Sequence, residues 1–111
     1  MKSGVAVADS GPIHYLALVG ELALLPKLFK TVLTPFSVQA ELRHSHAPDA
    51  VKQWMANPPV GFEFVAPASP RLFTNIHRGE SDAIQLAIER GISSILMDDQ
   101  NARAVAAANG L

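Results

Sequence analysis

The chain contains no cysteine, which excludes both a disulfide framework and a thiolate metal site. No apolar run approaches the roughly 20 residues that a membrane-spanning helix needs. Residues 1–9 hold one lysine and a short apolar stretch, which is not the pattern of a secretory signal peptide. There is also no glycine-rich phosphate loop, which disfavours P-loop chemistry and hydride transfer. These absences favour a cytoplasmic protein with no membrane attachment.

An excess of positive charge is missing as well. Nine Lys and Arg residues face ten Asp and Glu residues, so the formal net charge is -1. Nucleic-acid-binding domains are often strongly basic, and this chain is not. The balance is not decisive, because acids that surround a metal ion are offset by the charge of that ion. With 111 residues, 49% of them hydrophobic, the chain is expected to fold as one domain over residues 1–111.

Short apolar runs alternate with helical patterns along the chain. The runs that predict strands are residues 5–8, 31–33, 62–65 and 94–97. The patterns that predict helices are residues 10–20, 21–29, 34–42, 48–57, 81–90 and 99–109. Ser10 is expected to cap the first helix, Thr34 and Pro35 to start the third, and Gly91 to end the fifth. The alternation predicts an α/β fold, a three-layer α/β/α sandwich around a mainly parallel sheet.

Acidic residues follow two of the predicted strands. Asp9 comes directly after residues 5–8, and the doublet Asp98 and Asp99 comes after the last apolar run. Glu41 and Glu80 lie in predicted helices. The carboxyl ends of parallel strands share one edge of the sheet, where such folds place their sites. Carboxylates gathered there repel one another unless a cation lies between them. The pattern therefore predicts a divalent-metal site and metal-assisted phosphodiester hydrolysis.

Each acid also has a plainer interpretation. Asp9 is a good helix cap, Glu41 alone would be a solvated helix residue, and acids in a first helical turn favour the helix dipole. The helix-dipole interpretation applies to both Glu80 and Asp82. If one of them binds a metal, Glu80 is preferred as the ligand, and Asp82 is expected to support it or to stabilise the helix. Capping does not explain two adjacent acids at the doublet. Neighbouring side chains diverge, so one of the pair is expected to face a metal, and Asp99 is the first choice.

Other polar residues carry weaker signals. Ser10 is either a helix cap or a hydroxyl beside a phosphate. Arg78 and Arg103 are candidates for phosphate contacts, since guanidinium groups pair well with phosphate. His44 and His46 lie in a predicted loop, where a pair of histidines without further ligands is usually solvated. The tryptophan and the five phenylalanines are expected in the core rather than as platforms for bases.

The acids lie in stretches that resemble the PIN-domain ribonuclease family, in particular the toxin-like branch of bacterial toxin–antitoxin systems. Four stretches are similar to the family's motifs, and they occur in its order: residues 5–13, 34–42, 79–87 and 96–103. The resemblance implies a metal-dependent endoribonuclease that uses Mg²⁺ or Mn²⁺. It also implies a homodimer, an RNA substrate and a small antitoxin protein that neutralises the toxin.

The resemblance further implies roles for individual residues. The catalytic set is Asp9, Glu41, Glu80 and Asp99. In the family these four residues would hold the ion. The residue patterns described above add further expectations. They place the metal ligands among Asp9, Glu80, Asp98 and Asp99, the supports of these ligands at Ser10 and Asp82, and phosphate contacts at Arg78 and Arg103.

Two departures from the family leave alternatives open. The third motif offers both Glu80 and Asp82, so its ligand is not decided. The family normally continues with a last strand and helix, so a C-terminally truncated PIN-like domain with an exposed sheet edge is expected. One rival hypothesis is an inactive PIN-like module that acts through a protein partner. Another is a receiver-type phosphotransfer domain, which is disfavoured because no lysine follows a late strand.

Overall fold

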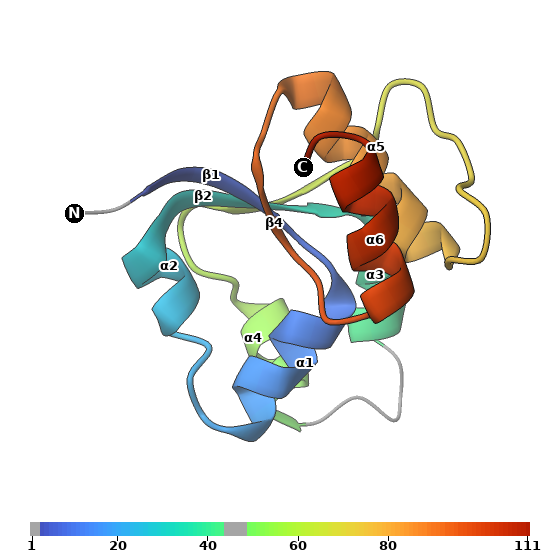
Figure 1. The fold of residues 1–111 in the computed structure, drawn as a ribbon. Helices are drawn as coiled ribbons and strands as arrows, with labels where there is room; N and C mark the ends of the chain where they lie inside the picture. The colour runs from blue at the N-terminus through green and yellow to red at the C-terminus, as the bar shows by residue number, and fades with distance from the viewer. Residues whose placement is uncertain (1–2, 44–48) are drawn as a thin grey trace.

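The computed structural model describes residues 3–43 and 49–111 (Figure 1). Four parallel strands form one sheet in the order β3-β2-β1-β4. The strands are β1 (Ser3–Ala8), β2 (Phe29–Pro35), β3 (Phe62–Val65) and β4 (Ser94–Leu96). The helices are α1 (Ser10–Leu18), α2 (Leu24–Leu28), α3 (Phe36–Leu42), α4 (Asp49–Ala56), α5 (Arg78–Arg90) and α6 (Gln100–Ala108).

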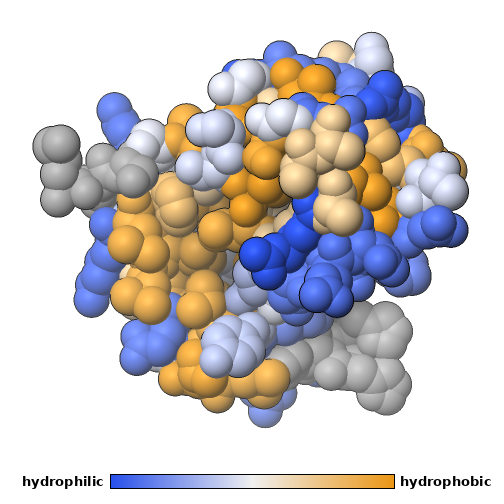
Figure 2. All heavy atoms as spheres, viewed as in Figure 1, coloured by the Kyte–Doolittle hydropathy of each residue, from blue (hydrophilic) through white to orange (hydrophobic). Residues whose placement is uncertain are grey.

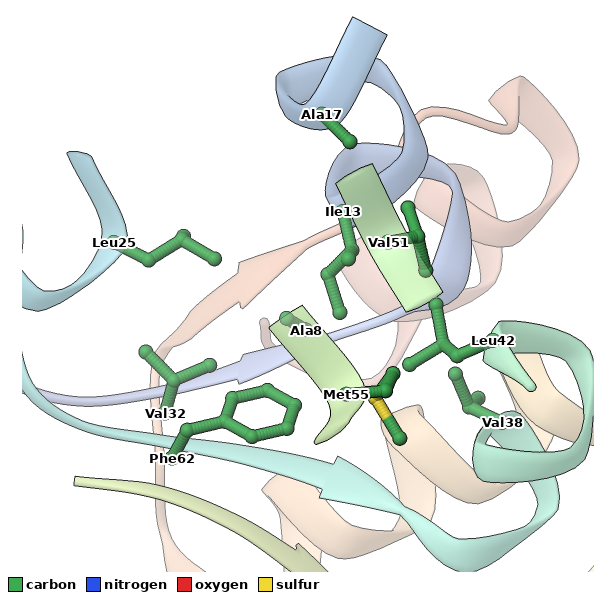
Figure 3. Close-up of a cluster of buried hydrophobic side chains, with 10 residues drawn as sticks. All are labelled: Ala8, Ile13, Ala17, Leu25, Val32, Val38, Leu42, Val51, Met55 and Phe62. Carbon is green, nitrogen blue, oxygen red and sulfur yellow. The ribbon is translucent and has the colours of Figure 1, made fainter. Parts of the chain in front are cut away.

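Helices cover both faces of the sheet, and each face has its own apolar cluster. On one face, Ala8 and Val32 of the strands pack with buried side chains of α1, α2, α3 and α4 (Figure 3). On the other face, Val7 and Leu33 pack with α5 and α6. Adjacent strand residues thus point to opposite clusters, as the pleat of a strand requires. The predicted three-layer α/β/α sandwich is confirmed, and its sheet is parallel throughout the described residues.

The strand registers bring the carboxyl ends of the two central strands and β4 to one level. Val7 of β1 lies opposite Leu33 of β2 on one side and Ile95 of β4 on the other. The backbone N–H of Asp9 donates to the carbonyl of Leu96 at 3.0 Å, which extends the pairing by one residue. Four helices, α1, α3, α5 and α6, begin at or near this edge, so their partially positive N-terminal ends gather there.

Two predicted helix starts are wrong in detail. Ser10 is the first residue of α1 rather than its cap, and Asp9 provides the cap. Thr34 does not cap α3, because Thr34 and Pro35 remain in β2, where they pair with Phe64 and Val65 of β3. The two residues expected to begin the helix therefore belong to the strand, and Pro35 is the N-cap of α3.

Other predictions at this level hold. Gly91 ends α5 in the left-handed conformation, with φ 63°, which glycine adopts without steric cost. The predicted loop with His44 and His46 lies outside the described residues. No helix in the described ranges is long and apolar enough to cross a membrane.

A groove of about 400 Å³ runs between α1, α2 and β4. Its walls include Tyr15, Leu24, Leu28 and Met97, with Arg103 beside them. Figure 2 shows apolar side chains gathered on this side of the molecule, while hydrophilic ones lie where α1 and α6 begin. Within the described residues, β4 pairs only with β1, so its other edge is open. This surface is apolar enough to accept another protein segment.

Two isoleucines one turn apart on α5 test the buried face of that helix. Ile84 is fully buried against the sheet, and Ile88 is 36% exposed. We expect Ile84→Ala to lower the free energy of unfolding by about 2–5 kcal/mol, since it removes buried methyl groups and leaves a cavity. Ile88→Ala should cost less than about 1 kcal/mol. Urea denaturation measures both, and equal losses would contradict the assigned orientation of α5.

Candidate active site

Asp9 is the buried centre of an acidic cluster at the carboxyl edge of the sheet. It is only 4% exposed and stands between the end of β1 and the start of α1. Its Oδ1 accepts a hydrogen bond from the backbone N–H of Ser10 at 2.8 Å. Burial is the largest cause that raises the pKa of Asp9, and the Ser10 N–H opposes it. The charges of Glu80, Glu41 and Asp98 also raise this pKa, which is about 6 with all of these causes together. Three other carboxylates therefore act on Asp9.

Glu41 reaches the cluster from α3. The hydroxyl of Ser10 donates to its Oε2 at 2.5 Å, which ties the start of α1 to the end of α3. The other carboxylate oxygen of Glu41 lies near Gly79, the second residue of α5. A Cβ at Gly79 would stand 3.3 Å from Glu41 Oε1 and 3.7 Å from Asp9 Oδ1. The same Cβ would stand 3.0 Å from the Val38 side chain, so the absence of a side chain at residue 79 lets α5 lie close to Val38 and Glu41.

Glu80 is the second buried acid, at 8% exposure. Its Oε1 accepts the backbone N–H of His77 at 3.0 Å, and the His77 side chain accepts from the Glu80 N–H, which completes a capping box. The plainer interpretation of Glu80, as an acid that stabilises the first turn of its helix, therefore holds. Its charge nevertheless acts on Asp9 as well. The Glu80 carboxylate therefore caps the start of α5 and also belongs to the acidic cluster.

The doublet after β4 divides between two tasks. Asp98 is exposed and lies directly against Gly11 in the first turn of α1, where any Cβ would overlap its carboxylate. Its charge acts on Asp9. Asp99 caps α6, since its Oδ2 accepts the backbone N–H of Ala102 at 2.9 Å. The structure thus brings Asp98, rather than Asp99, against the centre of the cluster.

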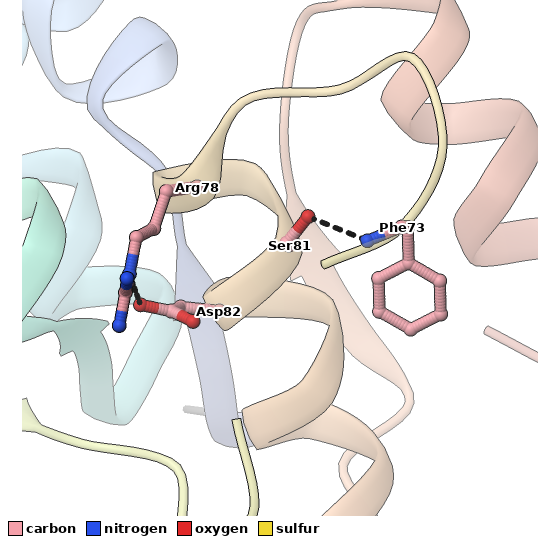
Figure 4. Close-up of polar contacts among 4 residues, drawn as sticks. All are labelled: Phe73, Arg78, Ser81 and Asp82. Atoms are coloured by element: carbon pink, nitrogen blue, oxygen red, sulfur yellow. Dashed lines mark hydrogen bonds and ion pairs between the residues drawn. The ribbon is translucent and has the colours of Figure 1, made fainter. Parts of the chain in front are cut away.

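Asp82 and the two arginines lie around this cluster. Asp82 is buried, and its Oδ2 is 3.7 Å from the Nε of Arg78 one turn earlier on α5 (Figure 4). The Arg78 side chain is 68% exposed. Beside this pair, Ser81 Oγ accepts the N–H of Phe73 and holds the preceding loop against α5. Arg103 lies in the groove beside β4.

The acids fit a hard divalent cation in chemistry. Asp9, Glu41, Glu80 and Asp98 offer only carboxylate oxygens, the ligands that Mg²⁺ and Mn²⁺ prefer. Asp9 and Glu80 are buried, whereas Glu41 and Asp98 are exposed to solvent. As the side chains stand, no three His, Asp or Glu residues of the described ranges are close enough to surround an ion. Side-chain rearrangement would therefore accompany binding.

Sequence reasoning missed the two glycines that shape this site. Gly11 and Gly79 stand in first helical turns, where their backbones allow Asp98 and Glu41 to approach. The signal was present, because glycine in a helix is unfavourable and often marks a close approach. Each glycine also lies within two residues of a predicted acid. The hydrogen bond from Ser10 to Glu41 had no signal in the sequence.

Comparison with known families identifies the fold. The family DUF3368, described as a PIN domain, matches residues 5–111, which is nearly the whole chain. Neither the curated proteins nor the solved structures contain a significant match. PIN domains are typically nucleases, and the parallel four-stranded sheet between helices is consistent with a PIN-like fold. The chain belongs to the PIN-domain family.

Proposed function

We propose that this protein is a metal-dependent endoribonuclease that hydrolyses phosphodiester bonds of RNA. One observation carries the proposal. Asp9 is a buried carboxylate at a strand end, and the charges of three further carboxylates, from three other segments of the chain, act on it. Such a gathering destabilises the fold without a cation, so a chain that retains it is expected to use it. Family membership supports nuclease chemistry in general.

The proposed roles follow from position. Asp9, Glu41, Glu80 and Asp98 would hold Mg²⁺ or Mn²⁺. When bound, such an ion lowers the pKa of a water ligand and stabilises charge on phosphate oxygens. Asp9 and Glu80 anchor the site from buried positions, and each is fixed by a backbone N–H. Ser10 orients Glu41 through its hydroxyl.

We assign to Asp98 the role that the sequence pattern placed first on Asp99. Asp98 acts on Asp9 and borders Gly11, whereas the Asp99 carboxylate is engaged in capping α6. In the third motif we prefer Glu80 to Asp82. Asp82 instead holds the exposed Arg78 at the start of α5, from which a guanidinium would reach a phosphate.

The biological setting is also a proposal. A cytoplasmic toxin of a toxin–antitoxin pair, active as a homodimer, agrees with the resemblance of the motifs. The apolar groove between α1, α2 and β4 offers a surface for a second chain or an antitoxin. The runner-up is an inactive PIN-like interaction module. It is favoured by the lack of three acids in ligand range among the described residues.

Cleavage of RNA by the purified protein tests the central proposal. With Mg²⁺ or Mn²⁺ we expect cleavage that EDTA abolishes and that added metal restores. Asp9→Asn should reduce the rate by roughly 100-fold or more, because it removes the central charge of the metal site. The native protein without metal is the control. Cleavage that persists in EDTA, or full activity of Asp9→Asn, would refute the metal mechanism.

The adjacent acids after β4 form a matched pair of variants. Asp98→Asn should weaken Mn²⁺ binding and cleavage by about 10-fold or more, since it removes a proposed ligand. Asp99→Asn should leave both nearly unchanged, because asparagine caps a helix about as well as aspartate does. Calorimetric titration with Mn²⁺ and the cleavage assay measure these effects. Loss of binding in Asp99→Asn alone would reverse the assignment.

Stability against pH provides a test that needs no activity. The folded pKa of Asp9, about 6, lies above its ordinary value of 3.8, so the folded state loses relative stability as pH rises through this window. Asp9→Asn keeps the acceptor for the Ser10 N–H but removes the charge. Without metal, it should be more stable than the native protein by on the order of 3 kcal/mol above pH 6 and equal to it below pH 4.

Urea denaturation at several pH values measures this difference. Mg²⁺ should then stabilise the native protein and leave Asp9→Asn nearly unaffected, since ligand binding stabilises only the form that binds. If metal-free Asp9→Asn is less stable than the native protein at neutral pH, the charge of Asp9 does not destabilise the folded state.

A further inference from the structure

A row of aromatic rings runs from the core to the carboxyl edge of the sheet. Trp54 of α4 packs on Phe62 of β3 with ring centroids 4.3 Å apart. Phe62 meets Phe64 edge to face at 5.1 Å, and Phe64 stacks on Phe36 at 6.1 Å with an interplanar angle of 27°. Phe62 is buried in the core cluster, so the inner rings are anchored there. Each ring supports the next, and the outermost ring is held in a defined orientation.

The outermost ring is exposed, unlike its neighbours. Phe36 is 52% exposed, whereas Phe64 is only partly so. A large aromatic ring that remains in solvent although it is held by a packed row is suited to bind something flat. Sequence reasoning expected the phenylalanines in the core, and Phe36 departs from that expectation. Since its inner face already stacks on Phe64, its exposed surface is the part available to a ligand.

Phe36 also stands at the edge that carries the acids. Val7 of β1 pairs with Leu33 of β2. β1 ends at Ala8, just before Asp9, and β2 ends at Pro35, so Asp9 and Phe36 both follow the carboxyl ends of these adjacent strands. Phe36 follows Pro35 directly and begins α3, the helix that carries Glu41. Glu41 in turn accepts the hydroxyl of Ser10, the residue next to Asp9. The ring and the proposed metal site therefore share this edge of the sheet.

A cation completes this surface. Arg78 is the first residue of α5, and α5 packs against α3 where Gly79 meets Val38. The guanidinium is largely exposed and bonded on one side to Asp82. An aromatic face and an arginine beside an acidic metal site are the elements that recognise single-stranded nucleic acid, because unpaired bases stack and phosphates pair with guanidinium.

We propose that Phe36 is the stacking platform for one unpaired base of the RNA, next to the scissile phosphate, and that Arg78 contacts the backbone there. The inference rests on the proposed function, whose site it extends. A base within a duplex cannot stack on this ring, so the protein would require unpaired nucleotides at the cleavage point. The ring is then a specificity-determining residue rather than a catalytic one.

Phe36→Leu tests the platform, because leucine still covers Phe64 but lacks a flat ring. Binding of a short single-stranded RNA is measured by fluorescence anisotropy in the Asp9→Asn background, so that the RNA stays intact. We expect Phe36→Leu to weaken binding by about 5- to 100-fold and Phe36→Tyr to restore it. Val60→Ala, which removes a fully exposed apolar side chain in the loop before β3, is the control and should have no effect.

Abasic substitution along the RNA identifies the stacked base. One abasic position should weaken binding to the protein with Phe36 and have no further effect on Phe36→Leu, since both changes remove the same contact. Equal binding by Phe36 and Phe36→Leu, or abasic losses that are the same in both, would overturn the proposal. A change of oligomeric state in Phe36→Leu with unchanged RNA binding would overturn it too, and would assign the ring to a protein interface.

The two proposals fail in different ways. If the native protein does not cleave RNA, the nuclease proposal fails. The binding measurements with Phe36→Leu and abasic RNA still decide the role of Phe36. If the native protein cleaves RNA and Phe36→Leu cleaves single strands with an unchanged KM, the nuclease proposal stands and the platform is lost.

Discussion

Repulsion among carboxylates that the fold forces together is the constraint on which the site depends. Asp9 is buried where β1 ends, and the pairing of β1 with β2 and β4 leaves it no alternative position. Glu80, Glu41 and Asp98 all raise its pKa. The surrounding structure moderates this cost through backbone N–H groups and helix N-termini. It does not remove the cost, and a divalent cation is the natural counter-charge.

The edge of the sheet is built so that the acids approach without clashing. Gly11 allows the Asp98 carboxylate to lie on α1, and Gly79 allows α5 to lie close to Val38 and Glu41. Both glycines stand where a helix would gain stability from a larger residue. The fold therefore gives up helix stability where the site requires room. Ser10 adds a direct link between α1 and α3, so two separate elements hold Glu41 in place.

Much of this was predictable from residue patterns, and the failures have physical causes. Apolar runs and helical periodicity identify the strands and helices, and the rule for strand ends places Asp9 and Asp98 together. The start of α3 was misplaced because pairing with β3 extends β2 through Pro35, which local propensity cannot reveal. The division of work between Asp98 and Asp99 depends on side-chain directions at a turn. The exposure of Phe36 depends on which ring ends a row assembled from three segments.

Anomalous diffraction from crystals soaked in Mn²⁺ locates a bound ion without any assumption about activity. If the clustered carboxylates hold a divalent cation, we expect one strong peak at the carboxyl edge of the sheet, bonded to oxygens of Asp9 and Asp98 and bordered by Glu41 and Glu80. An edge without a peak at saturating Mn²⁺, or a peak held by Asp99 and remote from Asp9, would contradict this expectation.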